Sequence, residues 1–269
     1  MPEGFELAVV VPVFNEENIL EKNLSFFANA CDRIIGAGRW HYVIVDNGST
    51  DTTPAIIDRL LERWPGSIKV LEPEPNYGKA LKAGLRQVTT PWAKTIDVDW
   101  WDVPFLAWSW SVKDDHDLLI GSKRADPTLN AQRPYRVFLS WGLNSLIQLF
   151  FRFPGSDTHG PKLLRMSTMK PILNVCTLAR GQFDAEFVLR ALRKGLWVCE
   201  APVICREQRP SRNLMVSKIL WNVIAFNRLR LILRETSYED FVKLRRFARP
   251  DVLQATPEDL RDDRSGRPV

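Results

Sequence analysis

Short apolar runs separated by amphipathic stretches organise the first half of the chain. Residues 7–13 and 42–45 are apolar without alternation, which is typical of strands buried on both faces of a parallel sheet. The strands expected from such runs are residues 7–13, 42–45, 67–71, 92–96 and 118–121. The intervening stretches have the spacing of helices, so the pattern predicts an α/β fold with a mostly parallel, Rossmann-like central sheet and helices on both faces.

Polar residues mark where the first two helices are expected to begin. Asn15 offers an N-cap for a helix that carries Leu20, Leu24 and Phe27 on one face. Asp51 and the three residues after it open a second helix. The remaining expected helices are residues 78–88, 135–153, 183–193 and 215–233, with a strand at residues 197–204.

Polar side chains follow three of the expected strands. Residues 13–17, 46–51 and 97–99 each stand where a strand ends. In parallel sheets, ligands bind beyond the carboxyl ends of the strands, so we expect these three segments to meet in one crevice.

Asp97 and Asp99 are the most informative pair of residues at these strand ends. Two carboxylates one residue apart suit a hard divalent cation, Mg²⁺ or Mn²⁺, that takes its other ligands from water and phosphate oxygens. Taken alone, an Asp-x-Asp triplet is more typical of a solvated strand-to-loop turn than of a metal site. The motifs that precede it give the triplet its weight.

Four motifs occur in a fixed order: VVVPVFNEEN from residue 9, VIVDNGSTDTT from residue 43, PNYGKALKAGL from residue 75, and the Asp97-Val98-Asp99 triplet. This set resembles the family 2 inverting glycosyltransferases with a GT-A fold. The closest resemblance is to polyprenyl-phosphate sugar transferases of the dolichyl-phosphate mannose synthase type. The likeness runs from residue 7 to residue 218.

The resemblance implies a nucleotide-sugar donor held at the strand ends. The donor-binding residues that it implies are Pro12, Phe14, Glu16, Asp46, Gly78, Lys79, Asp97 and Val98. Asp97 and Asp99 would bind the metal, with Asp99 as the principal ligand and a catalytic residue. Glycine allows close backbone approach to an anion, and Lys79 carries the charge that neutralises a diphosphate.

The acceptor side resembles the family less closely. The residues implied for acceptor or phosphate binding are Lys123, Arg136, Ser140, Lys162, Arg209 and Arg212. At Lys123 and Lys162, lysine stands where the relatives carry arginine, and lysine lacks the bidentate geometry of arginine toward phosphate. Trp101 occupies the position of a family glutamine, so Asp102 is a candidate substitute ligand.

The role of Asp184 and Glu186 depends on the acceptor. A phosphate acceptor is already anionic and needs no general base, whereas a hydroxyl acceptor must lose its proton to a carboxylate. Asp184 or Glu186 would serve as that base. The alternative is an acidic pair that only stabilises the start of a helix.

The basic residues gather near the carboxyl end of the chain. Residues 215–249 carry eight basic and three acidic side chains, so this segment alone equals the net charge of +5 of all 269 residues. We expect a domain at residues 1–214, a basic amphipathic helical segment at 215–249 and a flexible tail at 250–269. The charge indicates an anionic partner, either lipid headgroups or nucleic acid. Together with the resemblance to polyprenyl-phosphate transferases, it leads us to expect a membrane surface and no nucleic acid. The alternative for the expected helices 135–153 and 215–234 is that they pack on the domain or form a homodimer interface.

No apolar run reaches the length of a membrane span, and the first residues lack the pattern of a secretory signal. The four cysteines have no metal-ligand spacing, which favours reduced thiols in a cytoplasmic protein. The basic carboxyl-terminal segment adds the expectation of a peripheral position on the inner face of a membrane.

Other functional classes fit the sequence less well. The loop after the first strand has neither the glycine-rich basic loop of nucleotidyltransferases nor the glycine fingerprint of dinucleotide-binding proteins. A catalytically silent binding protein on the same fold remains an alternative, because the neighbourhood of the Asp-x-Asp triplet departs from the relatives.

Overall fold

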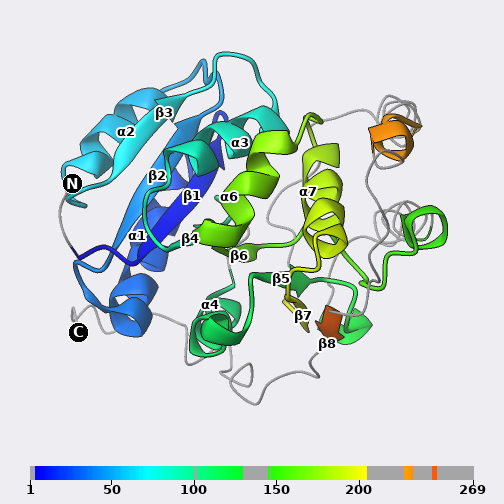
Figure 1. Cartoon of the computed structure of the whole chain (residues 1–269). Helices are drawn as coiled ribbons and strands as arrows, with labels where there is room; N and C mark the ends of the chain where they lie inside the picture. The colour runs from blue at the N-terminus through cyan, green and yellow to red at the C-terminus, as the bar shows by residue number, and fades with distance from the viewer. Residues whose placement is uncertain are drawn as a thin grey trace.

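A computed structural model describes residues 4–99, 102–129, 145, 147–204, 227–232 and 244–246. In these residues eight strands form one sheet (Figure 1). The strands are β1 (Leu7–Val13), β2 (Trp40–Asp46), β3 (Ile68–Leu71), β4 (Trp92–Thr95), β5 (Leu118–Ser122), β6 (Lys162–Arg165), β7 (Val198–Pro202) and β8 (Leu244–Arg246).

The strand order in the sheet is β3-β2-β1-β4-β6-β5-β7-β8. Strands β1 to β4 are parallel, with Val10 level with Val43 on one side and with Thr95 on the other. β6 runs antiparallel to both of its neighbours, β4 and β5, and β7 and β8 continue parallel to β5. The expectation of a mostly parallel sheet is therefore confirmed.

Six α-helices with assigned bounds cover the described sheet. They are α1 (Leu20–Cys31), α2 (Thr53–Leu61), α3 (Tyr77–Gln87), α4 (Val103–Ser111), α6 (Met166–Val175) and α7 (Gln182–Arg193). A π-helical turn (Asp32–Gly36) follows α1, and 3-10 turns lie at Lys113–Asp115 and Pro127–Leu129. Residues 147–151 and 227–232 are also helical.

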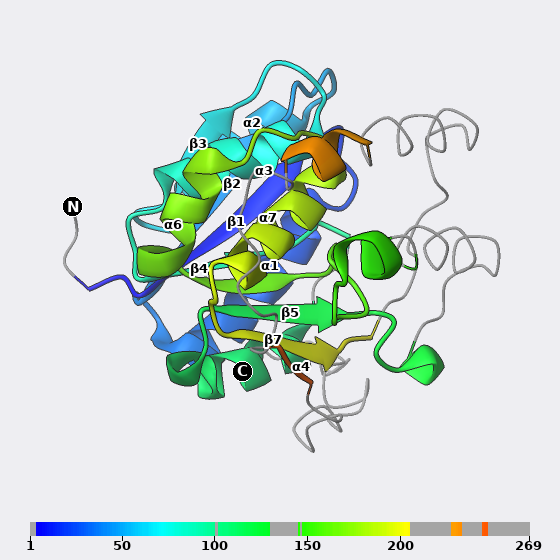
Figure 2. The ribbon, with the colours of Figure 1, turned by 45° about the vertical axis from the view of Figure 1, so that its right-hand side comes forward.

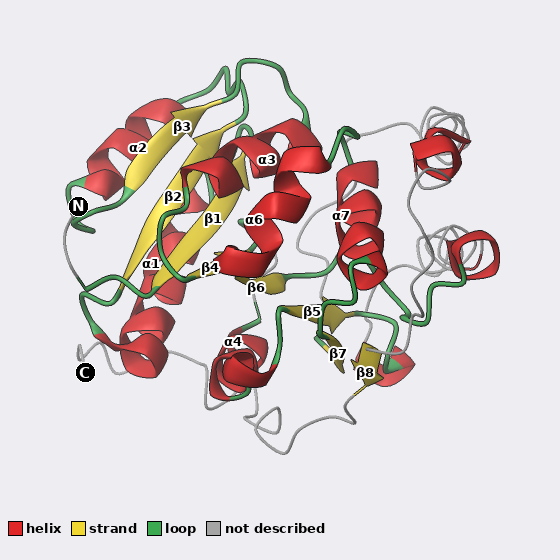
Figure 3. Cartoon of the chain, in the orientation of Figure 1, coloured by secondary structure: helices red, strands yellow, loops and turns green. Residues whose placement is uncertain are grey.

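The helices form two layers because successive strand residues face opposite sides. Val10 and Val43 pack under α3, with α6 and α7 completing that layer. Val9 and Ile44 face the other way, toward the layer of α1, α2 and α4. Figure 3 shows the two layers as red helices on either side of the yellow strands. Burial on both faces explains why β1 and β2 are apolar without alternation.

The expected strands lie within a few residues of the observed ones, but several features differ. Asn15 does not cap α1, which begins at Leu20 without a side-chain cap. Residues 244–246, expected in a helical segment, form β8 beside β7. The short β6 and the helices α4 and α6 had no clear sequence pattern. Most of the expected helices 135–153 and 215–233 lies outside the described residues.

The sheet reverses its winding between β1 and β4. The chain places β2 and β3 on one side of β1, and β4 on the other. At such a switch point the loops after the two strands diverge and leave a crevice at their carboxyl ends. The candidate site lies there.

Candidate active site

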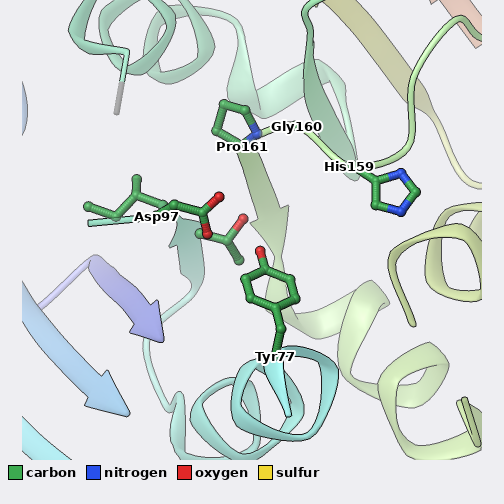
Figure 4. Close-up of a pocket in the computed structure, with 7 residues that line it drawn as sticks. Tyr77, Asp97, His159, Gly160 and Pro161 are labelled. Carbon is green, nitrogen blue, oxygen red and sulfur yellow. The ribbon is translucent and has the colours of Figure 1, made fainter. Parts of the chain in front are cut away.

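A cavity of about 300 Å³ opens at this switch point. Its lining comes from the ends of three strands and the start of one helix: Pro12, Val13, Phe14, Glu16, Asn47, Tyr77, Asp97, Val98 and Asp99. A narrower cavity of about 10 Å³ continues from Asp97 and Tyr77 toward His159, Gly160 and Pro161 (Figure 4). The structure therefore brings the expected strand-end segments together.

The loop after β1 is fixed by the loop after β2. The Asn15 backbone N–H donates to Ser49 Oγ at 3.1 Å, and its side-chain Oδ1 accepts the Thr50 N–H at 2.8 Å. The Glu16 N–H donates to Thr53 Oγ1 at 2.8 Å. Asn15 adopts a positive φ of 55°, a conformation that asparagine tolerates better than most residues. These contacts hold the loop residues that line the cavity.

Asp46 and Asn47, at the end of β2, have different roles. Asp46 is buried, and its Oδ1 accepts the Ser49 N–H at 3.0 Å, so this carboxylate holds the turn. Asn47 lines the cavity instead, and its Oδ1 accepts the Asn76 N–H at 2.9 Å. Asn47 was missed because an Asn-Gly pair is equally typical of a plain turn.

The segment before α3 contacts a distant loop. Asn76 caps α3 by accepting the Lys79 N–H, and the same Oδ1 accepts the Arg180 N–H at 2.8 Å. A Cβ on Gly78 would lie 2.4 Å from the Arg180 carbonyl oxygen, so the glycine permits this close approach. Lys79 points away, and its ammonium pairs with exposed Glu74 at the surface.

Asp97 and Asp99 both face the large cavity, while the side chain of Val98 between them is buried in the core. The Asn23 side chain donates to the Val98 carbonyl oxygen at 2.9 Å and holds the triplet's backbone in place. Figure 4 shows the Tyr77 hydroxyl directed at the Asp97 carboxylate, with which it forms a hydrogen bond.

The Asp97 carboxylate lies in a strongly negative environment. Loss of contact with bulk water, and then the charges of Asp99 and Asp184, raise its pKa to about 7, while the Tyr77 hydrogen bond acts in the opposite direction. Burial, followed by the charge of Asp97, also raises the pKa of the Tyr77 hydroxyl well above its ordinary value. A cation between the two aspartates would relieve this repulsion.

The residues present fit a divalent cation that is shared with a ligand. In the described part of the chain, no group of three or more His, Cys, Asp or Glu side chains could hold a metal by itself. Asp97 and Asp99 would supply two carboxylates at most, and phosphate oxygens and water would complete the shell, as Mg²⁺ prefers. Asp102 is not among the residues that line the cavity, so the structure does not support it as the substitute for the family glutamine.

Asp102 instead caps α4. It is buried, its Oδ1 accepts the Phe105 N–H at 2.8 Å, and its Oδ2 accepts the Ile204 N–H at 2.8 Å. Both carboxylate oxygens are therefore engaged away from the cavity. Trp100 and Trp101 lie outside the described residues.

Lys162 and Asp184, expected in two different roles, bind each other. The Lys162 ammonium lies 2.6 Å from Asp184 Oδ1 and 2.9 Å from the Gly160 carbonyl oxygen, and both side chains are almost completely buried. This pairing keeps Lys162 from reaching a phosphate. Asp184 Oδ2 has no hydrogen-bond partner in the described part of the structure, and its charge acts on Asp97.

Glu186 is engaged by its own helix and the loop before it. The carboxylate accepts N–H groups from Thr177 and Leu178, at 2.9 and 2.7 Å, and pairs with Arg190 at 2.8 Å. The geometry therefore gives Glu186 a structural role, and of the two acids only Asp184 lies near the cavity.

The remaining acceptor residues lie beyond β5 or outside the described residues. Lys123 follows β5 directly, and Ser122 Oγ is 2.7 Å from Ser156 Oγ. Buried Glu200 accepts the N–H groups of Ser156 and Asp157 and ties these loops to β7. Arg136, Ser140, Arg209 and Arg212 are outside the described part of the chain, so their roles stay predictions.

Tyr77 is the principal residue that sequence reasoning missed. It stands inside the Asn-x-Gly-Lys segment, where an aromatic side chain in the first turn of a helix is as typical of the core as of a site. Its partner Asp97 is twenty positions away in the sequence, so neither residue alone indicates the hydrogen bond.

Comparisons with known proteins bear on the family and the fold. A family model described as Glycosyl transferase family 2 matches residues 8–107. The dolichyl-phosphate beta-glucosyltransferase of Trichomonas vaginalis is 28% identical over 218 residues, which cover 77% of this chain and 67% of the relative. The dodecaprenyl-phosphate galacturonate synthase of Rhizobium johnstonii is 29% identical over 182 residues, or 63% of this chain and 51% of the relative.

A solved structure shares the fold. The mannosyltransferase PcManGT from Pyrobaculum calidifontis, in complex with GDP-Man and Mn²⁺, matches with a TM-score of 0.59 at 20% identity, over 94% of this chain and 69% of that chain. The strand-end cavity, the family match and the shared fold lead to one assignment. Residues 8–107 match the glycosyl transferase family 2 model, and the chain is a glycosyltransferase with the GT-A fold.

Proposed function

We propose that this enzyme transfers a sugar, with inversion at the anomeric carbon, from a nucleotide-diphosphate donor to a polyprenyl phosphate of the dolichyl type. The observation that carries the proposal is the single cavity in which Phe14, Asn47 and the Asp97–Asp99 pair converge. Relatives named for dolichyl-phosphate and dodecaprenyl-phosphate substrates support the class of acceptor.

The donor's nucleoside would lie between the ends of β1 and β2. Pro12 and Phe14 offer apolar surface to a flat base, and Glu16 and Asn47 offer groups that hydrogen-bond a base or ribose. The buried Asp46 would act through the turn that it holds. Because Lys79 is paired with Glu74 at the surface, the diphosphate charge would be met chiefly at Asp97 and Asp99 through a cation.

Mg²⁺ or Mn²⁺ at these two carboxylates would stabilise the charge that develops on the departing diphosphate. Asp99 and Asp97 would hold the cation, and Tyr77 would orient Asp97 through its hydroxyl. The Tyr77 hydrogen bond also favours the ionised form of Asp97, which is the form that binds metal.

A phosphate acceptor needs no general base, which is consistent with the pairing of Asp184 with Lys162. The acceptor oxygen attacks the anomeric carbon while the bond to the leaving diphosphate breaks, and no proton has to be removed. One oxygen of Asp184 is held by Lys162 at 2.6 Å, which favours a positioning role over that of a base. Lys123 and the predicted Arg136 would meet the acceptor phosphate.

The direct test is transfer by the full chain in detergent, with UDP-, GDP- and dTDP-sugars, Mn²⁺ and a polyprenyl phosphate. We expect Asp99→Asn to abolish transfer while circular dichroism and the melting temperature stay near wild type, because the metal loses an anionic ligand at a partly exposed position. Metal-stimulated turnover in that variant would refute the assignment of Asp99.

A hydroxyl acceptor on a glycan or lipid is the second candidate. The observation in its favour is Asp184 Oδ2, which is buried without a hydrogen-bond partner among the described residues. Parallel assays with the polyprenyl phosphate and the matching free polyprenol decide between the two. A product formed only from the free alcohol would make Asp184 the base.

We place the enzyme at the cytoplasmic face of a membrane, where a lipid-borne acceptor is found. The three described cysteines, Cys31, Cys176 and Cys199, are unpaired and buried, which is consistent with a reducing compartment. If thermal-shift screens detect nucleotide sugars but no donor is ever hydrolysed or transferred, the protein is instead a silent binding protein.

A further inference from the structure

Two short helical segments, residues 147–151 and 227–232, pack beside the layer formed by α3, α6 and α7. Residues 147–151 and 227–232 each bury one side in the core, where Ile147, Phe151 and Leu229 belong to the same apolar cluster as α7. Their inward sides are therefore accounted for by packing. Their outward sides carry large exposed side chains.

The outward side is unusually apolar. Leu149 is 73% exposed, Phe150 46% and Leu231 62%. The guanidinium carbon of Arg230 lies 5.9 Å from the centroid of the Phe150 ring, which brings the outer sides of the two segments together. We call Leu149, Phe150 and Leu231, with Arg228 and Arg230, the outer patch.

The charge of the outer patch has one sign. Arg228 and Arg230 are both exposed, and neither segment contains an acidic residue. Long arginine side chains extend over apolar surface and keep their charge at its rim. Apolar side chains surrounded by cations are typical of surfaces that lie in the headgroup region of an anionic bilayer.

We propose that the outer patch docks the enzyme on an anionic membrane. Leu149, Phe150 and Leu231 enter the boundary between headgroups and acyl chains, and the two arginines contact lipid phosphates. No helix in the described part of the chain has the length and hydropathy to span a bilayer, and docking of this kind requires none. The proposal rests on the proposed function only in taking the acceptor to be a lipid.

The patch stands on the functional side of the fold. Figure 2 shows residues 147–151 beyond the carboxyl ends of β5 and β7, and residues 227–232 beside the start of α7. The same ends of the strands carry the catalytic crevice, and α7 begins near Asp184. Docking through this patch therefore brings the lipid surface to the acceptor side of the site.

The test is flotation of the full chain with phosphatidylcholine vesicles, with and without phosphatidylglycerol. We expect binding only to the anionic vesicles, and weaker binding at high salt because the charges are exposed. The double variant Leu149→Ser/Leu231→Ser should lower the partition coefficient at least roughly tenfold. Each of Arg228→Ala and Arg230→Ala should lower it roughly fivefold at low salt.

Leu71→Ser is the matched control, because Leu71 is 66% exposed on the edge strand β3, at the far end of the sheet. It should bind vesicles like the wild type. Donor hydrolysis in solution should be unchanged in all these variants, which separates docking from catalysis. A wild type that does not bind anionic vesicles, or patch variants that bind normally, would overturn the proposal.

A second copy of the chain is the other occupant that the experiment detects. If the Leu149→Ser/Leu231→Ser variant turns a dimer into a monomer in light scattering and leaves vesicle binding intact, the patch is a contact between copies and the docking proposal is wrong. Transfer to a detergent-solubilised polyprenyl phosphate tests the proposed function separately, because it does not depend on vesicle binding.

Discussion

Gly78 lies in the first turn of α3, where the loop before α7 crosses the helix. A Cβ at this position would lie 2.4 Å from the oxygen and 2.5 Å from the nitrogen of Arg180, and 2.8 Å from the Ala179 carbonyl carbon. These are backbone atoms, so no side-chain rotation relieves the overlap. In Gly78→Ala the loop has to move away from α3.

The cost of this substitution follows from two opposing effects. Overpacking of a tightly packed site costs about 1–3 kcal/mol, while alanine gains about 1 kcal/mol over glycine within a helix. The net loss is therefore about 0–2 kcal/mol, or a fall of up to about 8 °C in the melting temperature for a domain of this size. The loss of activity should be larger than this stability change implies.

The reason is that the displaced loop leads directly to the site. Moving Arg180 breaks its hydrogen bond to Asn76 and shifts the start of α7, which carries Asp184. Gly78 is also adjacent to Tyr77, the hydrogen-bond partner of Asp97. A misplacement of about 1 Å at a catalytic site can lower the rate roughly a hundredfold.

Gly84→Ala is the matched control in the same helix. A Cβ there would lie 2.6 Å from a methyl of Val10 and 2.7 Å from a methyl of Val45, in the core and away from the cavity. Melting temperature and the kcat and KM of sugar transfer would be measured for both variants. We expect both to lose stability and only Gly78→Ala to lose kcat beyond it. Equal kinetic losses, or wild-type kinetics in Gly78→Ala, would refute the reasoning.

Two further predictions concern ionisable side chains at or near the site. Because ionised Asp97 binds metal and its pKa is about 7, Mn²⁺ affinity should rise as pH increases through 7. Tyr77→Phe removes a contact that lowers this pKa, so Mn²⁺ titrations of the variant should show the rise in affinity at higher pH. An unchanged pH profile would contradict the role of Tyr77. Lys162→Met leaves Asp184 buried and uncompensated and should destabilise the fold by about 3–5 kcal/mol in urea unfolding. Lys79→Met, which breaks only a surface pair, should leave the unfolding curve unchanged.

The sequence by itself determined the architecture and the position of the crevice. Apolar runs without alternation identify β1 and β2 because both faces of those strands are buried. Burial on both faces requires an apolar side chain at nearly every position, and this can be recognised without knowing which residues are in contact. The carboxyl ends of parallel strands meet at one edge, so Asp97 and Asp99 could be placed at the crevice without knowledge of any contact.

Only the tertiary structure decided which polar groups are available to a ligand. Lys162 and Asp184, 22 positions apart, neutralise each other, and the two oxygens of Asp102 are taken by α4 and by Ile204, 102 positions away. Gly78 matters because of Arg180, also 102 positions away. Residue type and local spacing define what a side chain can do, but the packing of distant segments sets its nearest partner. A buried polar group forms its hydrogen bonds with the partners that this packing places beside it, and is then not available to a ligand.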